Sequence, residues 1–193
     1  MSFDVIPKAK SSSKPGTIYA IAGEDDYIYY GQISADKTIG FFKFRTELLM
    51  TMEEVVLHPI MSRFIVNFPS IGRAMRKGLW QKMGSAKLPE QLNNTIDTAQ
   101  WPVGELNVSI WRGGEVIKNT SVFDPTIQDI EIIQAYDADY HVIERLKADY
   151  ENPDNSFEVG GSIKRERKLK EMLAQKHKDK PWHNLPDNWV YSD

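Results

Sequence analysis

Residues 17–44 read TIYAIAGEDDYIYYGQISADKTIGFFKF, and this stretch decides the fold. β-Branched and aromatic residues alternate with small or polar ones in three runs, at 17–21, 27–33 and 38–44. Such alternation is typical of strands, and the turn-like sequences GEDD and SADK separate the runs. The stretch therefore predicts an antiparallel meander with one buried face. Gly31 and Gly40 interrupt the second and third runs and indicate bulges or bends in a small, curled sheet.

The rest of the chain carries further strand and helix signals. Apolar or alternating runs occur at 60–68, in a hairpin over 106–118 that turns at a Gly-Gly pair, and at 127–133. Apolar residues at helical spacing, with capping signals, predict helices at 51–57, 69–77, 137–150 and 164–178. The third of these helices is expected to turn Ile143 and Leu146 inward and Asp149 to water. Together the elements predict an α+β fold, in which short helices pack on a curled antiparallel sheet, with a C-terminal helix and an aromatic tail added.

The domain organisation is predicted from shifts in composition along the chain and from its Pro- and Gly-containing segments. Small polar residues, Pro and Gly make up much of segment 1–16, which is typical of a flexible leader. A single α+β domain is expected over 17–152. A linker, a basic helix and an aromatic tail are expected over 153–193, and the tail is too aromatic to stay in water, so we expect it to pack back onto the domain.

The composition excludes several classes of chemistry. The chain of 193 residues has no cysteine, so it has no disulfide, no thiolate nucleophile and no Cys-ligated metal. No window approaches the roughly 18 consecutive apolar residues that a membrane span needs. The first residues also lack the basic and apolar regions of a secretory signal. We therefore expect a cytoplasmic protein that does not bind membranes.

No complete catalytic constellation is present. The sequence lacks a GxSxG elbow and a glycine-rich phosphate loop followed by Lys-Ser or Lys-Thr. Metal-ligand spacing on a helix occurs only for His141 with Glu144 and for His177 near Asp179, and solvent-facing positions are the favoured interpretation of both pairs. We expect no catalytic, cofactor-binding or metal-binding residues and a chain that is not an enzyme. A metal-dependent hydrolase using His141 is the alternative.

Charge is distributed unevenly behind the formal net charge of -3. Residues 164–180 carry eight Lys or Arg against three Asp or Glu, whereas 124–154 carry two against nine. An acidic surface repels nucleic acid and speeds the encounter with a cationic partner, so the favoured partner is a basic protein. The competing interpretation is simple solubility. The candidate acidic face consists of Asp124, Asp129, Glu131, Asp137, Asp139 and Glu144.

Tryptophans give an alternative binding face, because interface energy often concentrates in Trp and Tyr. The candidate anchors are Trp101, Trp111, Trp182 and Trp189. The competing interpretation places these rings in the core or in the docking of the tail. The basic helix at 164–180 suggests a nucleic-acid-binding adaptor as a further alternative, but its interleaved acids are those of an ordinary soluble helix, so nucleic acid is not the expected partner.

A series of short sequences adds an indication that composition does not provide. They are GTIYAI at 16–21, YYGQI at 29–33, IGFF at 39–42, GLW at 78–80, the run at 84–90 and VIERLK at 142–147. In this order they resemble the immunity proteins of bacterial polymorphic toxin systems, and most closely the immunity family numbered twenty-six. The resemblance covers roughly residues 15–150. The segment 8–14 and everything beyond residue 152 depart from the pattern.

The resemblance implies a role in toxin neutralisation. Members of such families are non-enzymatic proteins that bind one cognate toxin domain, commonly a nuclease or another effector acting in the cytosol, and so protect the cell from contact-dependent inhibition. A one-to-one complex with a basic toxin domain is therefore expected. The acidic segment agrees with this, because a nuclease needs a cationic cleft for phosphate, and an acidic surface could occlude that cleft or a neighbouring site.

Overall fold

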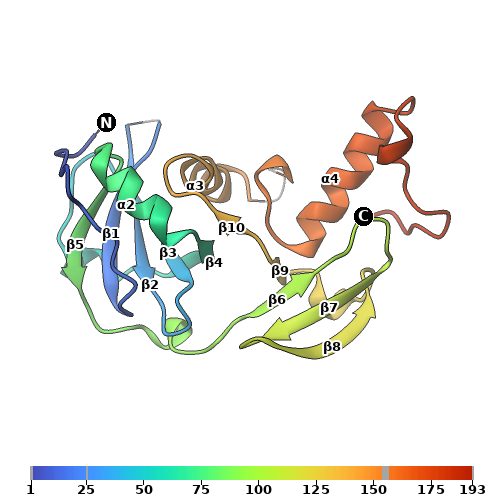
Figure 1. Ribbon diagram of the computed structural model, residues 1–193, viewed down its shortest axis with the longest axis horizontal. Helices are drawn as coiled ribbons and strands as arrows, with labels where there is room; N and C mark the ends of the chain where they lie inside the picture. The colour runs from blue at the N-terminus through green and yellow to red at the C-terminus, as the bar shows by residue number, and fades with distance from the viewer. Residues whose placement is uncertain (1, 25, 154–156, 193) are drawn as a thin grey trace. The chain divides into compact units, whose positions relative to one another are not determined.

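The computed structural model describes residues 2–24, 26–153 and 157–192. The chain divides into two compact units (Figure 1). Unit 1 comprises 1–95 and 134–153, and unit 2 comprises 96–133 and 154–193. The α+β fold class predicted from the sequence is confirmed, because both units combine antiparallel strands with helices.

Unit 1 is built on a six-stranded sheet with the order β10-β4-β3-β2-β1-β5. All neighbouring strands are antiparallel except β10 and β4, which are parallel. The strands are β1 (Thr17–Ala22), β2 (Ile28–Ile33), β3 (Ile39–Thr46), β4 (Ile60–Val66), β5 (Trp80–Ser85) and β10 (Ala135–Tyr136). The predicted meander is confirmed as β1 to β3. Both faces of β1 and β2 are buried, however, and not one face as expected, since separate apolar clusters cover the two sides.

The two glycines of the meander have different roles. The pairing of β2 with β3 shifts between Tyr29 and Gly31, which confirms the predicted bulge at Gly31. A Cβ at Gly31 would lie 2.9 Å from Ile39 Cγ2, so any larger residue at this position would clash with the core. Gly40 is regularly paired, and its missing side chain makes room for Leu92. Gly40 therefore serves close packing, and the irregular step of β3 comes directly after it, between Phe41 and Phe42 in the pairing with β4.

Helices of unit 1 are short and are fixed to the sheet by buried apolar side chains. They are α1 (Met52–Val55), α2 (Phe68–Arg76), α3 (His141–Glu151) and the 3-10 helix η1 (Glu90–Leu92). The predicted capping box of α1 is present, with Thr51 and Glu54 exchanging hydrogen bonds. The core packed between sheet and helices includes Tyr19, Phe41, Trp80, Tyr136, Ile71 and Leu146.

Helix α3 differs from its sequence-based description in one respect. Ile143 and Leu146 are buried as expected, but Asp149 is also buried, with 7% of its surface exposed. Asp149 accepts hydrogen bonds of 2.8 and 2.9 Å from Nε of Arg145, which itself donates to the Tyr136 hydroxyl. The expectation that Asp149 faces water is wrong, because a buried arginine one turn earlier balances its charge.

Segment 1–16, expected to be a flexible leader, is held against unit 1 within its described residues. The amide of Phe3 donates to the Gly78 carbonyl at 2.7 Å, and Ala9 is buried. The Ser12 amide donates to the Tyr19 hydroxyl at 2.8 Å. The segment itself contributes backbone amides to both bonds, and every residue except proline has one, so its small polar composition gave no sign of them.

Unit 2 contains a four-stranded sheet with the order β8-β7-β6-β9. The strands are β6 (Asp97–Gln100), β7 (Asn107–Arg112), β8 (Glu115–Ser121) and β9 (Glu131–Ile132), and β9 runs parallel to β6. The predicted hairpin is confirmed as β7 and β8, with Gly113 and Gly114 at positive φ in its turn. The helices are α4 (Ile163–Lys176) and the 3-10 helices η2 (Pro125–Ile127), η3 (Phe157–Val159) and η4 (Pro181–His183).

The core of unit 2 joins the sheet to the start of α4. Ile163 lies in one buried cluster with Ala99, Val108, Ile110 and Ile127. The expected single domain over 17–152 is therefore divided between the two units, because α4, which lies beyond that range, completes a core that begins at β6. Such long-range packing leaves no local mark in the sequence. Across residues 2–24, 26–153 and 157–192, none of the helices combines the length and the apolar character that a bilayer crossing requires.

Candidate functional site

Asp139 of the candidate acidic face is committed to an internal ion-pair cluster. Its carboxylate accepts hydrogen bonds from Nε and Nη2 of Arg73, at 2.9 and 2.7 Å, and from Nζ of Lys77 at 2.7 Å. Only 10% of the Asp139 side chain is exposed. Hydrogen bonding to Arg73 holds the pKa of Asp139 far below its usual range. This carboxylate stabilises unit 1 and is not free to meet a partner.

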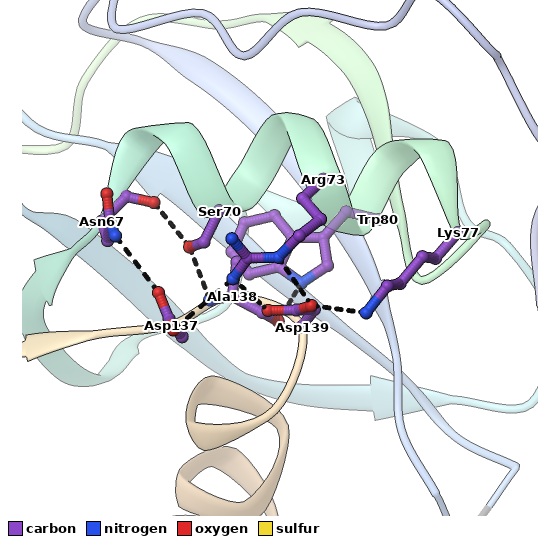
Figure 2. Close-up of polar contacts among 8 residues, drawn as sticks. All are labelled: Asn67, Ser70, Arg73, Lys77, Trp80, Asp137, Ala138 and Asp139. Atoms are coloured by element: carbon purple, nitrogen blue, oxygen red, sulfur yellow. Dashed lines mark hydrogen bonds and ion pairs between the residues drawn. The ribbon is translucent and has the colours of Figure 1, made fainter.

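The neighbouring residues complete a polar joint between α2 and segment 137–139. Figure 2 shows Asn67, Ser70, Arg73 and Lys77 along one side of α2, facing this segment. Asn67 donates to Asp137 at 3.2 Å, and the Ser70 hydroxyl accepts the Ala138 amide at 2.8 Å. The Ala138 carbonyl accepts the indole N–H of buried Trp80 at 2.9 Å. The joint places the start of α3 on the core of unit 1.

Asp124 is likewise occupied, in this case by a turn of unit 2. It accepts hydrogen bonds from Nζ of Lys118 at 2.7 Å, from the Thr120 hydroxyl at 2.9 Å and from both the amide and hydroxyl of Thr126. These bonds, that from Lys118 first among them, hold the pKa of Asp124 well below its usual range. Asp124 caps the start of η2 and is a structural residue.

The other acidic candidates are more accessible. Asp129 is exposed, and Glu131 and Glu144 are half-buried. Hydrogen bonding to Glu144 raises the pKa of Tyr140, whose side chain is 57% exposed. Asp124, Asp129 and Glu131 belong to unit 2, and the other three belong to unit 1. Neither unit therefore contains the complete acidic face that the sequence suggested.

The alternative aromatic set is assembled much better by the structure. Trp101, Trp182 and Trp189 all line one pocket of unit 2, with a volume of about 280 Å³. The first comes directly after β6, and the other two lie in the C-terminal tail after α4. Apolar atoms dominate the pocket walls, which also include Leu173 and Leu185. Residues about 80 positions apart in the chain thus form one candidate binding site.

Two of these tryptophans hold the tail on unit 2. Trp101 and Trp189 stack with ring centroids 6.0 Å apart, and Phe123 meets Trp189 edge-on at 5.4 Å. The indole N–H of Trp101 donates to the Glu105 carbonyl, and that of Trp189 donates to Glu171. The expectation that the tail packs back is fulfilled within unit 2, and the competing interpretation of tail docking applies to these two rings.

Buried charges of α4 fix the rest of the tail. Glu171 accepts the Ser192 amide at 2.8 Å, and Arg167 donates to the Val190 carbonyl at 2.8 Å. Both side chains belong to residues only 8% exposed. Arg165 is buried too, so two of the cations that suggested nucleic-acid binding face the interior of unit 2. This arrangement removes part of the basic surface on which that alternative depended.

Trp182 differs from the other two, since 73% of its surface is exposed. It sits in η4 at the edge of the pocket, where the Lys180 ammonium lies 5.5 Å from its ring centroid. A large exposed ring beside an apolar pocket is the arrangement expected of an interface anchor. Trp182 is therefore the strongest single candidate for contact with a partner.

Charged side chains occupy part of the pocket wall. Lys170 lies over the Trp101 ring, with its Nζ 5.0 Å from the centroid and 3.2 Å from Oε1 of Glu166. Glu105 and His183 also line the pocket, and His183 stacks on His177 with centroids 5.2 Å apart. The pocket wall thus combines aromatic rings with the carboxylates of Glu105 and Glu166 and the ammonium of Lys170.

Trp111, the fourth aromatic candidate, is not brought to this pocket. It lies on β7, paired across the sheet with Thr98 and Val116. Its ring is half-buried, and within the described part of the chain its buried indole N–H has no hydrogen-bond partner. Trp111 therefore belongs to the sheet and not to the candidate site.

The metal-site alternative finds no support in the geometry. His141 is exposed at the start of α3, and Glu144 is engaged with Tyr140. Throughout residues 2–24, 26–153 and 157–192, no group of three or more His, Asp or Glu side chains is arranged to hold a metal ion. The stacked pair of His177 and His183 gains no third ligand among those residues.

Sequence reasoning missed the polar members of the pocket. On sequence alone, 164–180 has the interleaved acids of an ordinary soluble helix, so neither Lys170 nor Glu166 is a predicted site residue. Their spacing of four residues is nevertheless that of a helical ion pair. What the sequence could not show is that Trp101, from another part of the chain, lies beneath Lys170. That contact depends on the docking of α4 onto the β6 sheet.

No family model, curated protein or solved structure matches this chain. The charge of the two units offers a further observation. Unit 1 carries fourteen basic and fourteen acidic residues, whereas unit 2 carries ten basic and thirteen acidic ones. The whole formal net charge of -3 therefore resides in unit 2, which also holds the tryptophan pocket.

Proposed function

We propose that this chain is a non-enzymatic immunity protein, which binds a cognate toxin domain through unit 2 and so neutralises it. The observation that carries the binding role is the convergence of Trp101, Trp182 and Trp189 on one pocket. Interface energy concentrates in a few buried aromatic anchors, and Trp182 offers a large ring that folding of unit 2 leaves exposed.

The charge of unit 2 supports a basic partner. Its sheet segment, 96–133, carries two basic and six acidic residues, and Asp129 is exposed within it. Such a field accelerates the approach of a cationic protein and disfavours nucleic acid as a partner. A nuclease-like toxin domain, whose substrate cleft must be cationic, has the required chemistry.

The biological role comes from the resemblance to immunity proteins of polymorphic toxin systems. On this proposal the protein acts in the cytoplasm, forms a one-to-one complex and covers the active or substrate-binding surface of the toxin. Asp139 and Asp124 contribute by stabilising their own units, because both carboxylates are saturated by internal partners. Contact with the toxin is assigned to the pocket and to the accessible acids of unit 2.

The test is co-expression with a candidate nuclease toxin domain encoded beside the gene of this protein, followed by calorimetry of the purified pair. Growth rescue and a one-to-one complex are expected. Trp182→Ala should weaken the complex by at least about tenfold, because truncating a central Trp anchor commonly costs 2 kcal/mol or more. Tyr140→Ala is the matched control, since it removes a similarly exposed aromatic ring from unit 1.

Two outcomes would overturn the proposal in different ways. Absence of both rescue and binding would remove the immunity role. A tight complex that tolerates Trp182→Ala but is lost in Tyr140→Ala would keep the role and transfer the interface to unit 1.

A further inference from the structure

Lys170 occupies a position in the pocket wall that suits any cation. Its ammonium lies 5.0 Å from the centroid of Trp101 and 3.2 Å from a carboxylate oxygen of Glu166. An aromatic face together with a carboxylate is the usual receptor for a lysine or arginine side chain. We name this position, formed by Trp101 and Glu166, the cation seat.

The hold of the cation seat on Lys170 is weak. The Lys170 and Glu166 side chains are 31% and 29% exposed, so water screens their attraction. The lysine stem is long and flexible, and its ammonium is readily hydrated once it leaves the ring. A second cation could therefore replace Lys170 without leaving Glu166 unpaired, since one ion pair would be exchanged for another.

We propose that the pocket accepts one lysine or arginine side chain of the basic partner, which displaces Lys170 from the cation seat. This inference rests on the proposed function, in which the partner is a basic protein. The pocket volume of about 280 Å³ lies at the low end for ligand sites and suits a single long side chain. Leu173, Leu185 and Pro186 in the walls would pack against its aliphatic stem.

Arginine fits the cation seat better than lysine. Its planar guanidinium can stack on the Trp101 face while it donates to Glu166, and it is less strongly hydrated than an ammonium. Glu105, which also lines the pocket, adds a second carboxylate near the entering charge. An anionic ligand would instead have to approach both Glu105 and Glu166, and only Lys170 and His183 oppose them within the wall.

The test uses the full-length protein alone and a small probe, so it does not depend on the toxin. Arginine methyl ester is titrated while the indole N–H resonance of Trp101 is followed by NMR. Citrulline methyl ester, which has the same α-amino group but an uncharged side chain, is the matched probe. We expect binding of the arginine ester only. Lys170→Met should tighten it about two- to fivefold by vacating the cation seat, and Glu166→Gln should weaken it by a similar factor. Lys164→Met, an exposed lysine of the same helix that does not line the pocket, is the control and should change nothing.

Three results would overturn the inference: equal binding of both esters, unchanged affinity in Lys170→Met, or a response to phosphate in place of the arginine ester. The toxin experiment separates this failure from that of the proposed function. A toxin complex that depends on Trp182, combined with no selectivity for the arginine ester, would reject the cation seat alone. Selective binding of the arginine ester without any toxin complex would reject the immunity role alone.

Discussion

Asp139 shows that a charged residue predicted to lie on a binding surface can instead form ion pairs within its own unit. Arg73 and Lys77 reach its carboxylate from one side of α2, and the backbone on either side is fixed by Ser70 and Trp80. Removing one partner from such a cluster leaves the other charges without compensation. The residue therefore matters for the stability of unit 1 more than for recognition.

Asp139→Asn is expected to lower the free energy of unfolding by about 1–3 kcal/mol, because two cations lose their shared anion. Urea denaturation followed by tryptophan fluorescence measures the loss. Asp137→Asn is the control, since that carboxylate is 40% exposed and lies 3.4 Å from Arg73, and it should cost clearly less. Equal losses in the two variants would contradict the assigned role of Asp139.

The hydrogen bonds of Asp139 also predict how the stability of unit 1 depends on pH. Hydrogen bonding to Arg73 and Lys77 holds the pKa of Asp139 below that of the unfolded chain, which is about 3.9. The native state then binds fewer protons than the unfolded one, so this stabilisation is complete above about pH 5 and is lost as the pH falls through the acid range. The free energy of unfolding should fall less steeply in Asp139→Asn than in wild type as the pH is lowered from about 5 to 3. Parallel curves would refute the linkage.

At the scale of elements, the C-terminal tail behaves as part of unit 2. It supplies Trp189 to the stack with Trp101, and α4 provides Glu171 and Arg167 to bind the tail. Without the tail, Glu171 would lose the hydrogen bonds from Trp189 and Ser192, and Arg167 would lose the one to the Val190 carbonyl, although it would keep Gln128. Burying charge that has lost hydrogen bonds is costly. The tail is therefore an element of the fold although it contains little regular structure.

Trp189→Ala should destabilise unit 2 by about 2–4 kcal/mol, since it removes the stacked ring and one partner of Glu171. Trp182→Ala, a change of the same size in a ring that is 73% exposed, should stay within about 0.5 kcal/mol of wild type. Thermal unfolding of the two variants gives the comparison. Similar melting temperatures for both would show that the tail contributes little to stability.

The sequence predicted most elements and few of their partners. The strands β1 to β3, the capping box of α1, the β7–β8 hairpin and the positions of α3 and α4 follow from local periodicity and turn residues. The two-residue strand β10 and the joint at 137–139 depend on pairing across the chain, which local patterns do not encode. Likewise the sequence named Trp101, Trp182 and Trp189 as anchors, but only the docking of α4 brings them together.

At the scale of the whole molecule, two cores are built from interleaved stretches of chain. The chain passes from one unit to the other after residues 95, 133 and 153. Net charge, the tryptophan pocket and the proposed cation seat are all found in unit 2, whereas unit 1 is electrically balanced. The molecule thus separates a neutral scaffold from a charged unit with the candidate binding function.

A chain ending at residue 152, the boundary that the sequence suggested, is expected to lose the order of unit 2. It would lack Ile163 from the core and Trp189 from the stack on Trp101. Hydrogen exchange should then show unprotected amides in β6 and β7, while β1 to β3 keep the protection they have in the full chain. Retained protection in β6 and β7 would mean that the strands of unit 2 are stable without α4.

The chain crosses between the two units three times, and these crossings limit which recombination events leave both cores intact. A recombination event with a single breakpoint exchanges everything on one side of it, so it would always divide at least one of the two cores. Transferring the binding unit to another scaffold would require both of its stretches, 96–133 and 154–193, to move together around an intact 134–153. Specificity in this protein is therefore expected to diversify by point substitutions around the pocket rather than by exchange of whole modules.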